Sequence, residues 1–351
     1  MPKVLIISDG YGRVIDTLYE YGNDLKYGWT LNDIDTLEVS LSLTNPKCTE
    51  KLAKLSNHIQ VVDKDTKNVL WGGIIFGHNF NDSTLKLNAL DFNSVLKHKR
   101  LRAKQYPEMK YGDLAKQLIL DWDSSTGQGV YLSGYGFQID SNTIKTTRSV
   151  KNTDFLWDKI KELGNDANYD YWVDQNAVFH FASRRGADKP YTLEYGGEQD
   201  NIIASPTLAR DIMSIENSVY AETDGDTPLT CKIDDTNSQN EYGLFEGTYS
   251  PNSGITDQST LNAQTQGELQ RNCYPADNIT LTIKDSSLCP FDDLEVGDRV
   301  EVHLIPYFNF DANVRILRMI QTESTGLREI TAGSIIFKPK VASKRLYKRG
   351  F

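Results

Sequence analysis

The stretch TDFLWDKIKELGNDANYDYWVDQNAVFHF, residues 153–181, decides the fold class because it encodes a helix followed directly by a hairpin. Its first half has a helical period, with apolar residues at positions i, i+4 and i+7, namely Leu156, Ile160 and Leu163. Thr153 is a suitable N-cap for this helix, and Gly164 is a suitable stop. The pattern predicts one short amphipathic helix.

From residue 169 the period changes to two. Apolar residues alternate with polar ones on both sides of a turn at 175–176, the apolar members being Tyr169, Tyr171, Val173, Ala177, Phe179 and Phe181. This alternation predicts a β-hairpin. The chain before residue 98 and after residue 190 shows almost no helical period. We therefore expect an α/β module, residues 98–190, inserted between two β-rich blocks.

The first block, residues 1–97, contains five or six strand patterns joined by hairpin turns. The segment WTLNDIDTLEVSLSL (29–43) alternates through Leu37, Val39, Leu41 and Leu43 and predicts a strand with one buried face. A short helical piece is expected at 48–55. Gly72 and Gly73 interrupt a later strand and indicate a bulge or a barrel bend. The block is typical of a small barrel or sandwich.

The inserted module begins with a basic connector, KHKRLRAKQYP (97–107). This connector is either a linker with solvated charges or a patch for an acidic partner. After it, YGDLAKQLILDW has an apolar helical face, with Asp113 as its expected cap. Together with the helix and hairpin of 153–181, these elements predict an α/β unit of about 90 residues.

The second block, residues 191–337, again has the pattern of a strand meander. A polar stretch at 234–262, rich in Asn, Ser, Thr and Gly, is expected to be a long loop that a helix near 263–272 closes. The final segment, 338–351, is a basic C-terminal tail. It is expected either to be mobile or to order against an acidic neighbour. The fold class is therefore mainly β with α/β inserts (α+β), as two β-barrel domains and a smaller α/β module.

Composition excludes several classes of protein. The 351 residues are 39% hydrophobic and carry a formal net charge of −10, which argues against general nucleic-acid binding. Acidic residues gather at 211–260, where ten Asp and Glu accompany Lys232 alone. This acidic stretch is either a solvated loop or a surface that repels polyanions. No apolar run is long enough to span a bilayer or to serve as a secretory signal, so we expect synthesis in a reducing cytoplasm.

Sequence motifs for catalysis and metal binding are absent. The five histidines have no zinc-ligand spacing, and the four cysteines have no CxxC pair, the residues being His58, His78, His98, His180 and His303, and Cys48, Cys231, Cys273 and Cys289. The acidic runs at 224–226 and 234–235 lack the rest of a calcium loop. We therefore expect no catalytic residue, no metal and no cofactor. The sequence leaves open a pair of catalytic carboxylates of the glycosidase kind, because such a pair has no sequence signature.

Four tryptophans allow a second reading. They form either a sugar-binding platform or parts of separate cores, and they are Trp71, Trp122, Trp157 and Trp172. The alternative function is thus a cell-wall polysaccharide hydrolase or a carbohydrate-binding β-protein.

The order of the blocks resembles the tail-hub family of long-tailed phages, that is, the tail-associated (Tal) proteins, which are related to the baseplate hub of contractile tails. Five segments carry the resemblance: WTLNDIDTLEVSLSL followed by HIQVVDKDTKNVLWGGIIFGHNF, then LNALDFNSVLKHKRL, the stretch 153–181, and LEVGDRVEVHL near the end. The match spans most of the chain.

This resemblance implies two tail-tube-like barrel domains and a homotrimeric ring whose six barrels present a pseudo-sixfold face to the tail tube. It implies a non-enzymatic structural hub at the virion tail tip. Its partners would be a distal tail protein or tail-tube ring, the tape measure protein, and tip, spike or receptor-binding proteins. DNA would meet it only in transit during ejection, and lytic activity would belong to a separate protein.

Overall fold

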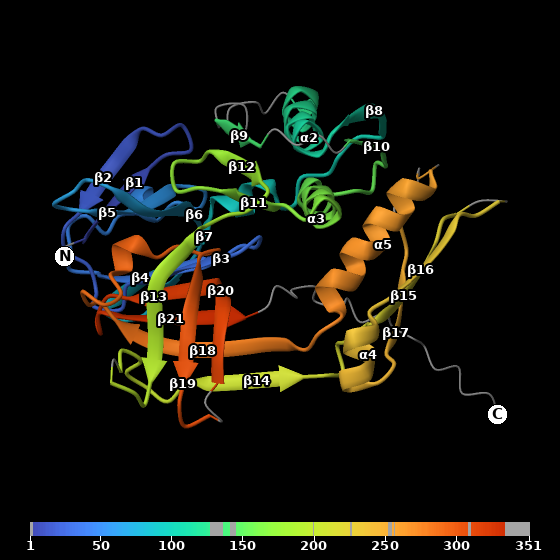
Figure 1. Ribbon diagram of the computed structural model, residues 1–351. Helices are drawn as coiled ribbons and strands as arrows, with labels where there is room; N and C mark the ends of the chain where they lie inside the picture. The colour runs from blue at the N-terminus through green and yellow to red at the C-terminus, as the bar shows by residue number, and fades with distance from the viewer. Residues whose placement is uncertain are drawn as a thin grey trace, which may run out of the picture.

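The computed structural model describes residues 3–126, 136–140, 145–198, 200–224, 227–251, 255, 257–307 and 310–333. In Figure 1 the first β region, coloured blue, lies on the left, a middle α/β region lies above, and a second β region lies below. A small fourth unit projects on the other side of the molecule from the N-terminus. The basic tail 338–351 lies outside the described residues.

The first β region is one antiparallel sheet in the order β2-β1-β5-β6-β7-β4-β3, with the short helix α1 beside it. Its elements are β1 (Lys3–Ser8), β2 (Val14–Leu18), β3 (Lys26–Thr30), β4 (Thr36–Ser42), α1 (Glu50–Ala53), β5 (His58–Asp63), β6 (Val69–Phe80) and β7 (Thr84–Asp91). The predicted alternation is confirmed in β4, where Leu37, Val39 and Leu41 are buried. The stretch 29–43 is nevertheless not one strand, because the chain turns at 31–35 through Asn32 at φ 55°.

The glycine pair in β6 has a different role from the one expected. Register shifts fall between Val61 and Val62 and between Ile75 and Gly77, so the glycines themselves are not the bulge. A Cβ on Gly73 would lie 2.1 Å from the carbonyl oxygen of Leu90. Glycine is therefore required there for close backbone approach.

The middle region packs two helices and two small sheets around one apolar core that includes Leu118, Trp157 and Phe181. Its elements are η1 (Phe92–Leu96), β8 (Lys104–Lys110), α2 (Tyr111–Thr126), β9 (Phe137–Ile139), β10 (Lys145–Val150), α3 (Leu156–Ala167), β11 (Asp170–Val173) and β12 (Phe179–Ala182). The predicted helix and hairpin of 153–181 are confirmed as α3, β11 and β12. The basic connector is not a free linker, since β8 begins at Lys104 and Lys99 lies over the Trp122 ring.

Both predicted boundaries of α3 are wrong. The N-cap is Phe155, which makes no side-chain capping bond, and the helix continues through Gly164 to Ala167. Asn168, in the left-handed conformation at φ 54°, ends it. Gly164 serves packing instead, because a Cβ there would lie 2.4 Å from Cδ1 of Tyr171. Asp113 likewise lies inside the first turn of α2 and does not cap it.

The second β region adds β13 (Asp188–Tyr195), β14 (Thr207–Asp211), β18 (Ala276–Lys284), η2 (Phe291–Asp293), β19 (Arg299–Leu304), β20 (Phe310–Thr322) and β21 (Leu327–Gly333). Most pairs are antiparallel, but β13, which descends from the middle region in Figure 1, pairs parallel with β19. The buried core of this region includes Val300, Ile316 and Ile330.

The acidic stretch is folded, so the prediction of a long loop at 234–262 is wrong. It contains β15 (Ser218–Glu222), β16 (Thr230–Asp234), α4 (Thr236–Tyr242) and β17 (Glu246–Tyr249), and α5 (Gln258–Asn272) covers this small sheet. The buried Asn217 explains why polar sequence is ordered here. Its side-chain amide donates to Ser238 and to the carbonyl of Gly243, and its oxygen accepts from the Phe245 amide. Such side-chain bonds replace apolar packing, which hydrophobic periodicity does not reveal.

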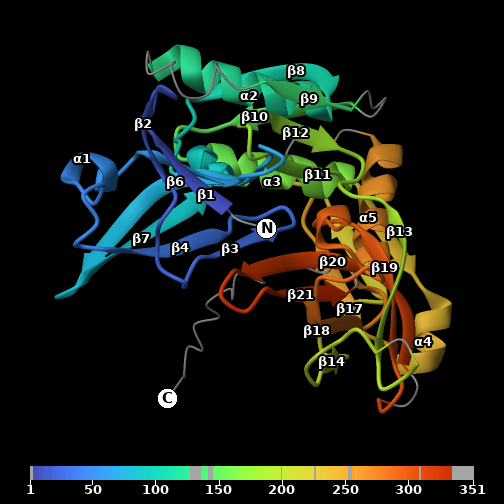
Figure 2. The ribbon, with the colours of Figure 1, turned by 90° about the vertical axis from the view of Figure 1, so that its left-hand side faces the viewer.

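The two β regions join into one sheet of 13 strands, because the long strand β20 reaches both of them. Its first half pairs with β19 and its second half with β3, while β21 pairs along its other side. Figure 2 shows β20 lying beside β3 between the two regions. The mainly β, α+β class is confirmed. Strand pairing among the described residues leaves this sheet open between β2 and β14 and closes neither region into a barrel. No helix in the described residues is both long and apolar enough to cross a membrane.

Candidate assembly surfaces and the junction that fixes them

A polar junction with a buried aspartate joins the two β regions. The guanidinium of Arg318 on β20 donates from Nε to Asp35 Oδ2 at 2.8 Å and from Nη2 to Asp35 Oδ1 at 2.9 Å. Asp35 is buried, and it also accepts from the Thr30 hydroxyl and the Thr36 amide. This paired geometry is the strong form of a charge-assisted hydrogen bond.

Asp91, at the end of β7, extends the junction toward the middle region. Its carboxylate accepts from the backbone amides of Asp35 and Asn93, and the Asn93 side chain accepts from the amide of Val173 in β11. Burial, together with the nearby Asp35 charge, raises the pKa of Asp91 to about 8 against the opposing effect of these hydrogen bonds.

A second ion pair, with both side chains buried, joins the middle region to the second β region. Arg315 of β20 forms an ion pair with Asp170 of β11 and donates to the carbonyls of Gly297 and Arg185. Asp170 also accepts from the side chain of Asn32 in the first region. Three segments that are far apart in sequence therefore meet through β20, and the junction fixes the regions relative to one another.

A groove of about 760 Å³ opens beside this junction, where all three regions contribute residues. Two of its carboxylates are used in structural contacts. Asp63 accepts from the amides of Asp65 and Thr66, and Glu323 accepts from the Tyr27 hydroxyl. The Arg328 guanidinium packs 4.3 Å from the centre of the Phe291 ring, and burial lowers its pKa. These bonds hold this side of the groove together, and Asp285, Asp292 and Glu295 also line it.

The four tryptophans do not form a shared sugar platform. Trp71 is buried in the core of the first region, where its indole N–H donates to the Gly28 carbonyl, whereas Trp157 is buried in the middle region. Trp172 stacks on His180 at 4.4 Å, and the Arg185 guanidinium lies 5.0 Å from its ring centre. The core reading is therefore correct for the buried pair.

The acidic candidates are largely used to hold the small unit together. Asp235 caps α4 by accepting from the Ser238 amide, and Asp234 accepts from the Gln239 side chain. Asp224 is exposed, and Asp226 lies outside the described residues. Asp257 caps α5, and the groups of Ser259 and Thr260 that donate to it lower its pKa to about 2.

All four cysteines are free, as expected. Burial raises the pKa of Cys273 to about 11 and that of Cys289 to about 11, so both stay as thiols at neutral pH. His303 belongs to a group of potential metal ligands with Glu301 and Asp311, and its Nε2 lies 3.1 Å from Asp311 Oδ1. The spacing along the chain gave no signal for this cluster, because cross-strand pairing brings Asp311 to it.

One end of the first β region exposes apolar side chains. We call this set the apolar rim, and it consists of Leu43, Leu55, Phe76 and Phe80, which are 40–61% exposed. The predicted burial of Leu43 is wrong, because β4 ends at Ser42 and the Leu43 side chain is 40% exposed. Backbone hydrogen bonds connect the segments that carry these residues. The amide of Ser56 donates to the Ile75 carbonyl, and the amide of Leu43 donates to the Ser83 carbonyl in the β6–β7 turn.

The rim includes an open strand edge. β5 pairs with β6 only as far as Ile74, whereas β7 follows β6 to Phe80. On the β5 side, residues 76–80 have no strand partner in the part of the chain that the structure describes. A long aromatic edge of this kind is a template for pairing with another chain.

Comparisons with known proteins place this fold. No sequence-family model and no curated sequence matches the chain. Its structure resembles the 43 kDa tail protein of prophage MuSo2 from Shewanella oneidensis, with a TM-score of 0.69, 12% identity, and coverage of 94% of this chain and 98% of the other. It resembles the tail protein of Neisseria meningitidis with a TM-score of 0.66 and 14% identity, covering 95% and 97% of the two chains.

A third similar structure is a prophage tail protein from Listeria monocytogenes, with a TM-score of 0.63, 16% identity, and coverage of 94% of both chains. A type VI secretion component of E. coli, described as similar to the bacteriophage T4 tail proteins gp27 and gp5, matches at a TM-score of 0.50 and 11% identity, over 89% of this chain and 74% of that one. The chain is therefore structurally similar, over nearly its whole length, to phage tail and baseplate hub proteins.

Proposed function

We propose that this chain is a non-enzymatic structural hub at the distal end of a phage tail tube. In this proposal three copies form a ring that joins the tube to tip or receptor-binding proteins and gates DNA passage during ejection. The observation that carries it is the match of nearly the whole chain to nearly the whole of three tail proteins. The proposal retains the division into a first β domain (1–97), an α/β module (98–190) and a second β domain (191–337), each β domain being tail-tube-like.

The junction between the regions supports a role as a rigid subunit of the ring. Two arginine–aspartate pairs and a strand shared between the β regions hold three regions in one arrangement. A ring that closes by a repeated heterologous contact needs a fixed angle between its two contacting faces. A rigid protomer supplies that angle.

The apolar rim supports contact with a neighbouring copy. Exposed Phe76 and Phe80 lie on an open strand edge, which suits strand addition together with apolar burial. Because Phe76 and Phe80 are already about half buried, completing their burial contributes roughly 2 to 3 kcal/mol before the cost of association. We propose that the rim meets the next subunit of the ring.

The small fourth unit, which consists of β15, β16, β17, α4 and α5, would suit the wall of the channel through the ring. Its exposed carboxylates would repel the DNA phosphates within a Debye length of about 8 to 10 Å and so prevent adhesion during passage. Two acids of this unit, Asp235 and Asp257, serve as helix caps, so their negative charge is fixed in place by the fold.

Mass measurement by light scattering tests the proposal. We expect a trimer of the 39.7 kDa chain and a ring in electron micrographs. A purified protein that stays monomeric across micromolar concentrations contradicts the hub. Cleavage of cell-wall polymer in a zymogram would instead favour the hydrolase alternative.

A paired substitution tests the rim separately. Phe76→Ser with Phe80→Ser should shift the trimer toward monomer, whereas Leu288→Ser, an exposed change in the second β region, should leave the mass unchanged. A trimer that survives the double substitution would move the interface away from the rim.

A further inference from the structure

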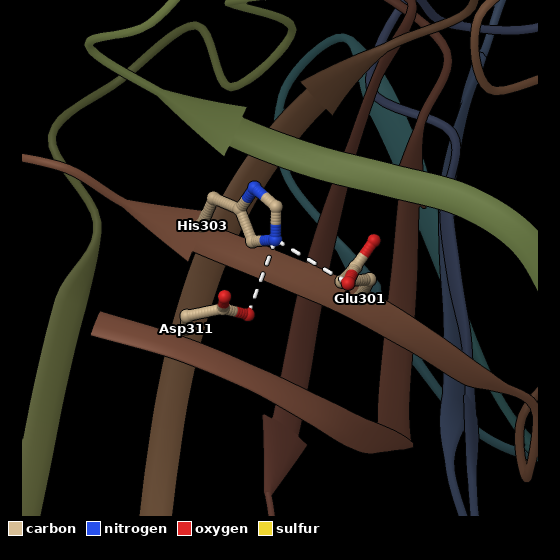
Figure 3. Close-up of side chains that lie close together, drawn as sticks. All are labelled: Glu301, His303 and Asp311. Carbon is tan, nitrogen blue, oxygen red and sulfur yellow. Dashed lines mark ion pairs between the residues drawn. The ribbon is translucent and has the colours of Figure 1, made fainter. Parts of the chain in front are cut away.

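Three side chains with metal-ligating atoms converge on the outer face of the second β region. Glu301 and His303 are two residues apart on β19, so both point to the same face of the sheet. Asp311 on β20 is the direct cross-strand partner of His303. Figure 3 shows the two carboxylates directed toward the imidazole ring. The potential ligand atoms of these three residues all lie within 4.8 Å of one another.

The imidazole nitrogen at the centre of the cluster lacks a hydrogen bond. His303 Nε2 lies 3.1 Å from Asp311 Oδ1 and 3.5 Å from Glu301 Oε1, as the dashed lines of Figure 3 mark. It is closed to solvent, and neither oxygen is aligned with it well enough to form a hydrogen bond. A buried polar nitrogen without a hydrogen bond costs free energy that a bound cation would recover.

The distances from His303 Nε2 to the two carboxylates fit ligands of one ion. Zinc binds histidine nitrogen and carboxylate oxygen at about 2.0 to 2.2 Å, so ligand atoms around a tetrahedral or octahedral ion lie roughly 2.9 to 3.5 Å apart. The two distances from Nε2 fall in this interval. A metal ion bound by His303 would lie along the lone pair of Nε2. Carboxylate oxygens beside that line, and not on it, lie where further ligands of the same ion would be.

A further contact orients one of the carboxylates. The Thr192 hydroxyl on β13 donates to Glu301 Oε2 at 2.9 Å, which leaves Oε1 directed to His303. Ligand carboxylates in metal sites are commonly oriented by such outer hydrogen bonds. Because Thr192 belongs to β13, the contact links all three neighbouring strands to the cluster.

We propose that Glu301, His303 and Asp311 bind one divalent transition-metal ion of the Zn²⁺ type. One imidazole nitrogen with two carboxylates suits Zn²⁺ better than Mg²⁺ or Ca²⁺, which prefer all-oxygen sites. The ion would complete its coordination with water and tie β19 to β20 opposite the later half of β13. The sequence predicts no metal, since the ligands come from two strands and match no linear motif.

Titration calorimetry with ZnCl₂ on the full chain, first treated with a chelator, tests the site. We expect one Zn²⁺ per chain, a rise in Tm on zinc addition, and no comparable response to MgCl₂. Asp311→Asn keeps the side-chain shape and should weaken Zn²⁺ binding at least tenfold, and His303→Ala should do the same. Circular dichroism checks that both variants fold.

Asp188→Asn on β13 is the matched control, because it removes a nearby exposed carboxylate that lies outside the cluster. It should leave zinc affinity unchanged. The proposal is overturned if the wild-type chain binds no zinc. It is equally overturned if Asp311→Asn and His303→Ala bind zinc as the wild type does.

Discussion

Arg318 and Asp35, 283 positions apart in the chain, form a two-bond ion pair in which Nε and Nη2 of the guanidinium each donate to a different carboxylate oxygen. The side chain of Asp35 is 2% exposed, whereas that of Arg318 is 43% exposed. The pair is therefore asymmetric, because the anion depends on the arginine for its compensation and the cation also reaches water. The pKa of Arg318 is raised, first by its hydrogen bond to Asp35.

Arg318→Ala should destabilise the protein by about 2 to 3 kcal/mol, since it leaves the Asp35 carboxylate buried without its cation. The cost is limited because the arginine is partly exposed, so water can partly replace its guanidinium. Chemical denaturation measures the change. Arg13→Ala, which removes a surface arginine paired with Asp9, is the control and should leave the unfolding midpoint in place. Equal effects of the two substitutions would mean that the junction does not stabilise the fold.

Asp91 should make stability depend on pH. Its pKa rises from 3.8 to about 8 on folding, so the folded state favours the protonated form. The stabilisation from this group is complete below pH 3.8 and is lost as pH rises through about 8. In Asp91→Asn, the free energy of unfolding should change less between pH 5 and 8 than in the wild type.

The measurement is the difference in unfolding free energy between wild type and variant at each pH. Asp257→Asn is the control, because the pKa of Asp257 is about 2 and lies outside this window. A constant difference between wild type and Asp91→Asn across pH 5 to 8 would show that Asp91 is ionised throughout.

Trp157→Ala should cost about 3 to 5 kcal/mol, because the ring is buried in the middle core and packs edge-on against Tyr171 at 5.5 Å. Trp172→Ala should cost less, about 1 to 2 kcal/mol, since its ring is half-buried between His180 and Arg185. Thermal and chemical unfolding compare the two. The opposite order would contradict the assignment of Trp157 to the core.

Two glycines in helices should respond oppositely to alanine. Gly164→Ala in α3 should destabilise the protein by about 1 to 3 kcal/mol, because the new methyl group meets the Tyr171 ring and the Tyr169 carbonyl. Gly267→Ala in α5 meets only the flexible end of Arg271 at 3.5 Å and should stabilise by about 0.5 to 1 kcal/mol through helix propensity. Unfolding midpoints decide, and a stabilised Gly164→Ala would disprove the packing role of that glycine.

The sequence predicted elements whose pattern is local. The α3–β11–β12 unit was readable because a helical period and a period of two follow each other within 29 residues of chain. The buried positions of β4 were readable for the same reason. The ends of the helix were harder to predict. Gly164 is typical of a helix end, but here it lies inside the helix because close packing against Tyr171 requires a glycine. The acidic unit was missed because buried polar bonds from Asn217 order it, and such bonds leave no apolar period.

The sequence by itself therefore determined the mainly β class, the middle α/β unit, and a resemblance to tail hubs that the structural similarity confirms. Only the tertiary structure decided that β20 joins the two β regions, that Arg318 meets Asp35, and that Asp311 reaches His303. Each of these contacts depends on strand register between distant segments. A period in sequence specifies which face of a strand is buried, but it carries no information about which strand lies next to it.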